Sequence, residues 1–208
     1  YGDHRDLPSF PTRRSSELVG VGVPEIVTVN VTVPTDASAG AHAITLRTED
    51  YHESAHVSTV ALELEVSQSH GFSLLLVSGP ATAAPGGEAN WLVDLRNSGN
   101  GNDSATFTLE GLPAGWNVSF TLDNTTLGAG ESAAIGLRVS VASDATAGSH
   151  GFTLVAQGAD ANASLPLELN VSSMRGVSLV MTDSASQSGR AGQVVFYRYI
   201  VTNTGNAA

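Results

Sequence analysis

The sequence of 208 residues contains no cysteine and no lysine, and aromatic residues make up only 6% of it. Without cysteine the chain forms neither disulfides nor a thiolate zinc site, and its redox compartment stays undecided. The nine basic residues, all arginine, stand against 20 acidic residues, which gives a formal net charge of −11. Because this charge repels phosphate backbones and anionic lipids, the composition argues against non-specific binding of nucleic acid or a membrane surface.

Long apolar runs and helical periodicity are also missing. No apolar run approaches 18 residues, so we expect no membrane-spanning helix in this chain. No segment keeps an apolar period of 3.6, so we expect almost no helix at all. Apolar residues instead alternate with polar ones, which predicts strands with one buried and one wet face. The alternating segments of the best-defined part of the chain are 72–76, 91–95, 105–109, 116–122, 133–141, 152–156 and 163–171.

An internal repeat with a period of about 105 residues organises the chain. The segment VPTDASAGAHAITL at 33–46 returns as VASDATAGSHGFTL at 141–154. Three further matches follow in the same order: 62–66 with 167–171, 71–74 with 176–179, and 97–100 with 203–206. This period is too long for a solenoid or a propeller blade, and it fits one small domain per repeat. Seven strands in about 100 residues are typical of an immunoglobulin-like β-sandwich.

The phase of the repeat predicts the domain organisation. We expect residues 19–66 to be the C-terminal half of an immunoglobulin-like module, 71–171 a complete module and 175–208 the N-terminal part of a third. The chain is therefore interpreted as a window on a longer tandem array. The linkers 67–70 and 172–175 are too short to be long flexible tethers, so we predict a semi-rigid string of modules.

The complete unit carries a series of turn motifs, namely Pro85-Gly-Gly87, Asn97-Ser-Gly-Asn100, Leu112-Pro-Ala-Gly-Trp116 and Val141-x-x-Asp-Ala-x-Ala-Gly148. In this series the chain resembles two families of bacterial and archaeal immunoglobulin-like modules, the CARDB (cell-adhesion-related) family and the alpha-galactosidase NPCBM-associated family. The resemblance implies an all-β fold of tandem seven-stranded sandwiches, one complete and two truncated. It also implies non-catalytic modules of secreted or surface proteins, sometimes placed beside hydrolase domains.

Two histidines occupy equivalent positions in the repeat. Modules of the families above carry a tyrosine after Ala-x-Ala-Gly-x, where this chain has His42 and His150. The exchange puts a tyrosine-corner hydrogen bond in question, although an imidazole can make a similar bond. Because a catalytic residue is not needed in every module, we interpret both histidines as structural.

Residues 1–18 follow no strand pattern. The repeat starts directly after them, where 19–22 aligns with 127–130 at an offset of 108. The segment is also similar to the conceptual translation of a sequencing-adapter read-through. We therefore interpret residues 1–18 as a non-native leader that arose when sequencing reads were assembled, and we expect it to form no part of the fold. The alternative is a genuine loop of the first module.

The sequence His52-Glu-Ser-Ala-His56 matches the H-E-x-x-H motif of zinc proteases. That motif works on a helix, which places both histidines on one face around zinc with the glutamate as general base. Here the repeat places it at a hairpin tip, where the second copy has 158–162. A metal site at His52 and His56 stays open as a remote alternative to an unliganded loop, and we predict no catalytic residue and no enzyme.

The loop Asn97–Asp103 is rich in oxygen ligands. It lacks the ordered spacing and the bidentate glutamate of a calcium loop, so turn chemistry is favoured over a calcium site and no cofactor is expected. Six Asn-x-Ser/Thr sequons make a glycosylated surface protein and a chance excess equally good interpretations. The candidate glycosylation sites are Asn30, Asn102, Asn117, Asn124, Asn162 and Asn170.

These observations favour a structural spacer or adhesion array of a large extracellular or cell-envelope protein, with neighbouring modules as its main partners. The alternative is an accessory module that docks polysaccharide beside a hydrolase. That function needs a row of exposed aromatic residues, whereas Trp91 and Trp116 both fall on predicted core faces. A surface polysaccharide or protein remains an open partner, and nucleic acid is not expected as one.

Overall fold

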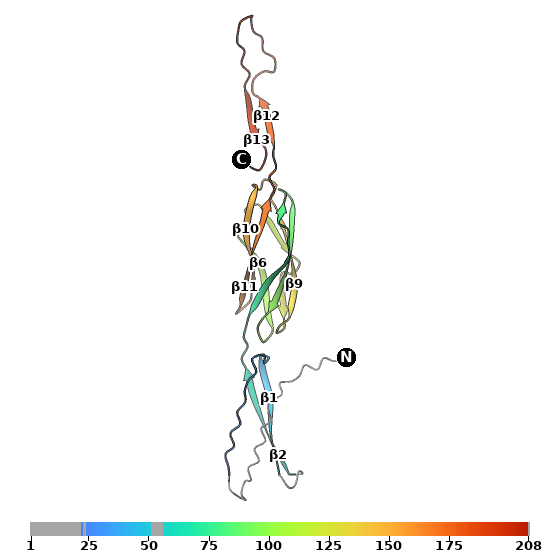
Figure 1. Ribbon diagram of the computed structural model, residues 1–208, viewed down its shortest axis with the longest axis vertical. Coiled ribbons are helices and arrows are strands. Elements are labelled where there is room, and N and C mark those ends of the chain that lie inside the picture. Colours follow the sequence, from blue (N-terminus) through green and yellow to red (C-terminus); the bar gives the residue numbers. More distant parts are fainter. Residues whose placement is uncertain (1–21, 23, 51–55, 208) are drawn as a thin grey trace, which may run out of the picture. The chain divides into compact units, whose positions relative to one another are not determined.

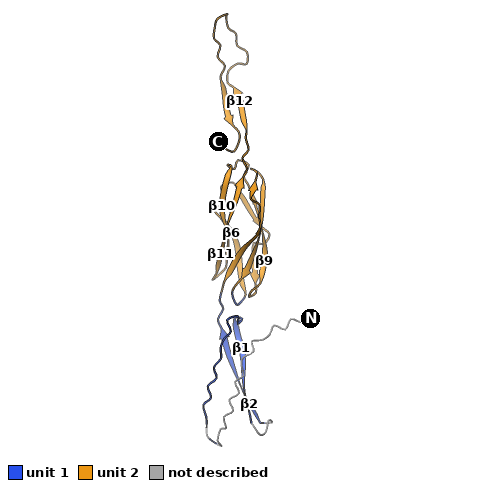
Figure 2. Cartoon of the chain, in the orientation of Figure 1, with its two compact units in different colours: residues 1–69, 99–101 blue, residues 70–98, 102–208 orange. Residues whose placement is uncertain are grey.

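The computed structural model describes residues 22, 24–50 and 56–207, so the leader 1–18 lies outside the described residues (Figure 1). Within the described part, all regular structure is β-strand, which confirms the predicted all-β class. No helix in that part is long and apolar enough to cross a membrane. Two compact units can be distinguished (Figure 2): unit 1 comprises residues 1–69 with 99–101, and unit 2 comprises residues 70–98 with 102–208.

Unit 1 contains one antiparallel hairpin. Strand β1 (Gly40–Glu49) pairs with β2 (Val57–Val66) in continuous register from Gly40↔Val66 to Glu49↔Val57. Along β1 the partly buried side chains alternate with exposed ones, which is the period of two that the sequence predicts.

Unit 2 contains a sandwich of two sheets that covers residues 72–171 (Figure 1). One sheet has the order β3-β5-β9-β7 and the other the order β4-β11-β10-β6-β8. Neighbouring strands are antiparallel except for the short parallel pair β4 and β11. The strands are β3 (Phe72–Ser78), β4 (Thr82–Ala83), β5 (Glu88–Asn97), β6 (Asp103–Glu110), β7 (Asn117–Phe120), β8 (Asn124–Leu127), β9 (Ser132–Ser140), β10 (Gly148–Gln157) and β11 (Asn162–Val171).

The core lies between the inner faces of these two sheets. Strand β5 buries every second residue from Ala89 to Asn97, because successive side chains of a strand point to opposite faces. Trp91 of β5 meets Phe152 of β10 edge to face, with ring centroids 5.5 Å apart. Such a pair stabilises the packing beyond the area that it buries. The alternating pattern therefore identified the buried face of the module correctly.

The segment 116–122, which the sequence predicts as one strand, contains only the four-residue strand β7 and then leaves its sheet. β7 pairs with β9, and after a bend at 121–123 the chain continues as β8, which pairs with β6. At the bend the Gly136 N–H donates to Thr121 Oγ1 at 2.9 Å. A Cβ atom at Gly136 would lie 2.6 Å from Thr121 Cγ2, so glycine is what allows the bend to pack against β9. Alternation along 116–122 cannot reveal this change of sheet.

A second hairpin follows the sandwich within unit 2. Strand β12 (Val177–Met181) pairs with β13 (Tyr199–Asn203) in the register Val177↔Asn203 to Met181↔Tyr199. In the repeat these strands correspond to β3 and to the C-terminal half of β5.

Two glycines of the sandwich allow a matched test of the core. A Cβ atom at Gly79 would lie 2.0 Å from Cδ1 of the buried Trp91 ring, whereas a Cβ atom at Gly151 would have nothing within 4 Å. We expect Gly79→Ala to lower the free energy of unfolding by about 1–3 kcal/mol, because the packed ring must move. Gly151→Ala should leave stability unchanged or raise it slightly. Urea unfolding followed by tryptophan fluorescence measures both, and equal stability of the two variants would contradict this packing.

Candidate functional site

The predicted metal motif at the β1–β2 turn is only partly within the described residues. His52 lies outside them, while His56 is exposed and its carbonyl oxygen accepts a hydrogen bond from the Asp50 N–H at 3.1 Å. Among the described residues no group of three or more histidine, aspartate or glutamate side chains is arranged to hold a metal ion. The zinc site therefore stays a remote alternative that rests on the sequence motif alone.

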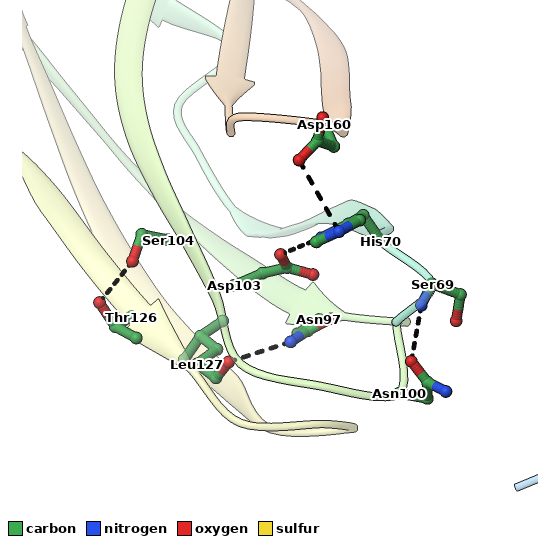
Figure 3. Close-up of polar contacts among 9 residues, drawn as sticks. All are labelled: Ser69, His70, Asn97, Asn100, Asp103, Ser104, Thr126, Leu127 and Asp160. Carbon is green, nitrogen blue, oxygen red and sulfur yellow. Dashed lines mark hydrogen bonds and ion pairs between the residues drawn. The ribbon is translucent and has the colours of Figure 1, made fainter. Parts of the chain in front are cut away.

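The residues of the oxygen-rich loop 97–103 have separate partners. The Asn97 side chain is fully buried, and its Nδ2 donates to the Leu127 carbonyl oxygen at 3.0 Å (Figure 3). Its backbone N–H donates to the Glu131 carbonyl oxygen, and its own carbonyl oxygen accepts from the Gly130 N–H. Asn97 thus ties the end of β5 to the β8–β9 turn, as a buried polar group must be hydrogen bonded. The calcium site stays an untested alternative to the turn chemistry that the sequence favours.

Three charged side chains from distant parts of the sequence meet at one end of the unit 2 sandwich (Figure 3). His70 precedes β3, Asp103 begins β6, and Asp160 lies in the turn between β10 and β11. His70 Nδ1 is 2.5 Å from Asp103 Oδ1, and its Nε2 is 3.7 Å from Asp160 Oδ2. The imidazole therefore lies between two carboxylates of one sheet. Asp103 is on β6 of that sheet, and Asp160 is in the turn between its strands β10 and β11.

The electrostatics of this cluster favour a charged histidine. The hydrogen bond to Asp103 raises the pKa of His70 above its ordinary value of 6.5, partial desolvation opposes the increase, and the negative charges of Asp103 and Asp160 add to it. The neighbouring hydroxyl group of Ser104 is directed to β8, where it lies 2.7 Å from Thr126 Oγ1 (Figure 3). Chemically the arrangement is a charge-assisted tie between three segments of the sandwich.

Sequence reasoning did not find this cluster. It placed His70 only in the linker 67–70 and gave it no partner. The structure instead pairs His70 with Asp103, 33 residues away. The available signals were the acidic residue that ends the 97–103 loop and the aspartate in the turn 158–161, but neither points to a histidine before β3.

The two equivalent histidines make the same hydrogen bond in both copies of the repeat. His42 Nε2 lies 2.8 Å from the Ser38 carbonyl oxygen, and His150 Nε2 lies 2.9 Å from the Thr146 carbonyl oxygen. Since a carbonyl oxygen only accepts, Nε2 carries the proton in each ring. The His150 ring also lies against Trp116, with ring centroids 5.1 Å apart. Each imidazole thus hydrogen bonds to a backbone carbonyl oxygen four residues upstream, which is the similar bond that the sequence left open.

The remaining predicted residues divide into surface and core positions. Trp91 and Trp116 are 4% and 7% exposed, which confirms their predicted core positions. Neither ring is therefore available as a flat platform for a sugar. All six sequon asparagines, Asn30, Asn102, Asn117, Asn124, Asn162 and Asn170, are exposed. Exposure is what glycosylation requires, and use of these sites stays a prediction.

No protein-family model matches the chain, and no curated protein matches it. Two of the similar solved structures are a conjugative transposon lipoprotein from Bacteroides eggerthii DSM 20697 and domains 4 and 5 of the S-layer protein SbsC. The lipoprotein is 13% identical with a TM-score of 0.33, and the match covers 48% of this chain and 96% of the lipoprotein. The S-layer match is 13% identical with a TM-score of 0.37, and it covers 74% of this chain and 88% of the other. Likenesses of this strength carry no argument about function.

The His70 cluster predicts a specific dependence of stability on pH. The pKa of His70 in the folded protein is raised above 6.5. The contribution of His70 to the free energy of unfolding is therefore complete below pH 6.5 and is lost as the pH rises through the pKa of the folded state. We expect NMR titration of the ring to give a pKa above 6.5. Asp103→Asn should return it towards that value, and Asp160→Asn should do so to a smaller extent. A wild-type ring that titrates at or below its ordinary pKa would contradict the cluster.

The histidine bond of the complete module can be tested at His150. His150→Phe keeps a ring against Trp116 and leaves the Thr146 carbonyl oxygen without its donor, so we expect a loss of about 1 kcal/mol in the free energy of unfolding. His150→Tyr supplies a hydroxyl donor and should recover part of that loss. Denaturant titration measures both variants, and equal stability of His150→Phe and wild type would show that the bond is not stabilising.

Proposed function

We propose that this chain is part of a tandem array of non-catalytic β-sandwich modules that acts as a spacer or adhesion element of an extracellular or cell-envelope protein. The observation that carries the proposal is the reuse of one hairpin design. The β1–β2 hairpin pairs Gly40 with Val66, and the β10–β11 hairpin pairs Gly148 with Val171 at offsets of 108 and 105 residues. Each hairpin also carries the histidine bond described above. An array of structural repeats requires that the contacts that hold each repeat together recur in every copy.

The use of polar residues in the module supports a structural function. Asn97 and His150 both make hydrogen bonds to backbone carbonyl oxygens, and His70 pairs with two carboxylates of its own unit. These groups are occupied in holding strands and turns together. The excess of acidic residues favours a well-hydrated, soluble surface. The turn motifs shared with surface-module families point in the same direction.

Polysaccharide binding is the weaker candidate. The described residues do include exposed aromatic side chains, such as Phe196 at 75% exposure, Tyr197 and Tyr199. At the repeat offset of 106, however, Tyr197 and Tyr199 take the positions of Trp91 and Val93, which are core positions of the complete module. These tyrosines are therefore better explained as core-face residues of a module than as a sugar platform.

A replacement experiment separates a spacer from a binding module. In the surface protein that carries the array, we exchange residues 71–171 for an unrelated immunoglobulin-like module of the same length, and in parallel we delete them. A spacer tolerates the exchange and not the deletion, as measured by antibody access to an N-terminal epitope on intact cells. If the exchange also abolishes attachment of the cells to a surface or a polysaccharide, module 71–171 is itself the binding element and the spacer function is wrong.

A further inference from the structure

Every polar atom of Asn206 in unit 2 makes a hydrogen bond, and these bonds connect the end of the β12–β13 hairpin to the sandwich and the linker 172–175. Asn206 Nδ2 donates to the carbonyl oxygens of Ala145 and Ser172 at 3.1 and 2.9 Å, and its Oδ1 accepts from the Met174 N–H at 2.6 Å. Its backbone N–H donates to the Met174 carbonyl oxygen, and its carbonyl oxygen accepts from the Ala147 N–H at 2.9 Å. A single residue after β13 thus binds the linker 172–175 and the turn before β10.

Asn100 makes the same five hydrogen bonds in unit 1, to which residues 99–101 belong. Its Nδ2 donates to the carbonyl oxygens of Ala37 and Ser67, both at 3.1 Å, and its Oδ1 accepts from the Ser69 N–H at 2.7 Å (Figure 3). Its backbone N–H donates to the Ser69 carbonyl oxygen, and its carbonyl oxygen accepts from the Ala39 N–H. The partners are the repeat equivalents of those of Asn206, atom for atom.

The chemistry of the two sites selects asparagine. Each site presents two carbonyl oxygens and one N–H to the side chain, and a carboxamide matches them with two N–H donors and one acceptor. Aspartate has the same shape, but it offers no donor and would place a negative charge against two carbonyl oxygens. Serine and alanine do not span the three partners. The site therefore tests the identity of the residue and not only its size.

A glycine next to each asparagine permits the loop to approach the linker segment closely. A Cβ atom at Gly205 would lie 2.4 Å from the Met174 carbonyl oxygen, and one at Gly101 would lie 2.7 Å from Gln68 Cδ. Both glycines therefore face a linker residue directly. In the second copy this contact explains the glycine of the Asn-x-Gly-Asn turn at Gly205, whereas in the first copy it involves Gly101, the residue directly after the turn.

We propose that the Asn-x-Gly-Asn loop of each module is a docking surface for the module that precedes it, and that Asn100 and Asn206 are the residues that fasten the linker and the Asp-Ala turn of that module. The partner is thus another module of the same array, recognised through backbone groups of its final linker and of its Asp-Ala-x-Ala-Gly turn. The proposal goes beyond the spacer function and does not depend on it, since an array of binding modules would need the same joint.

Substitutions at Asn100 in the full chain test the joint. Asn100→Ala removes all three side-chain hydrogen bonds, whereas Asn100→Asp keeps the acceptor and loses both donors. The reporter is the Ala39 amide, because its acceptor is the backbone carbonyl oxygen of residue 100 and neither substitution removes it. We expect hydrogen exchange at Ala39 to become roughly tenfold faster in both variants as the joint opens. Asn124 is exposed and makes no side-chain hydrogen bond within the described residues, so Asn124→Ala and Asn124→Asp are matched controls.

A distance measurement provides a second readout. The chain has no cysteine, so spin labels can be placed within unit 2 at two exposed positions, with Ser119→Cys on the sandwich and Thr202→Cys on the β12–β13 hairpin. We expect a narrow distribution of label distances by pulsed electron resonance in the parent and in both Asn124 controls, and a broad one in Asn206→Ala and Asn206→Asp. Amide protection of buried core residues such as Val93 shows that the sandwich itself stays folded.

Two results would overturn the proposal. The first is unchanged exchange at Ala39 in Asn100→Asp together with an unchanged distance distribution in Asn206→Asp. The second is a slowing of exchange at Ala39 in the wild type on addition of calcium chloride that is lost in Asn100→Ala, which would make the loop a calcium site. If an Asn100 variant fails to fold, Asn206→Ala and Asn206→Asp repeat the test with the Ala147 amide as reporter. Loss of the joint in these variants leaves the spacer test, which exchanges the whole module, unaffected.

Discussion

The burial of alternate side chains between two sheets is the constraint on which the complete module depends. β5 supplies Trp91, Val93 and Leu95 from one sheet, and β10 supplies Phe152 and Leu154 from the other. Because the chain has no cysteine, no disulfide shares this task. The polar ties at the ends of the sandwich act on strands that the core has already placed. The hydrogen bond of Asn97 to Leu127, for example, joins the end of β5 in one sheet to the end of β8 in the other, so it requires that the two sheets are packed together.

The loop that follows β5 shows how one short segment serves several contacts. Asn97 turns inward to the β8–β9 turn, Asn100 binds the linker residues Ser67 and Ser69, and Asp103 pairs with His70. The same polar residues that suggest a cation site in the sequence are used to satisfy backbone groups and one imidazole. A loop rich in side-chain oxygens offers hydrogen-bond acceptors, and which donor they bind depends on the strands and linkers that lie next to the loop.

Much of the fold follows from the sequence, because the alternation of apolar and polar residues shows which face of each strand is buried. It placed Trp91 and Trp116 in the core, and the repeat indicated that His42 and His150 perform the same structural task. The change of sheet at 121–123 was not predictable, since a strand that leaves one sheet for another keeps its alternation. The His70 cluster was not predictable either, because no local pattern connects a residue before β3 with residues at the start of β6 and after β10.

The drift of the repeat offset explains why the H-E-x-x-H motif stands apart from the module design. Seven residues, 50–56, connect β1 and β2, and four residues, 158–161, connect β10 and β11, so the connection in the first copy is three residues longer. This difference accounts for the fall in offset from 108 at Ala37 and Ala145 to 105 at Ser67 and Ser172. Those same residues nevertheless meet Asn100 and Asn206 in identical fashion. The contacts that recur in both copies lie at the ends of these strands that are opposite to the connection of variable length.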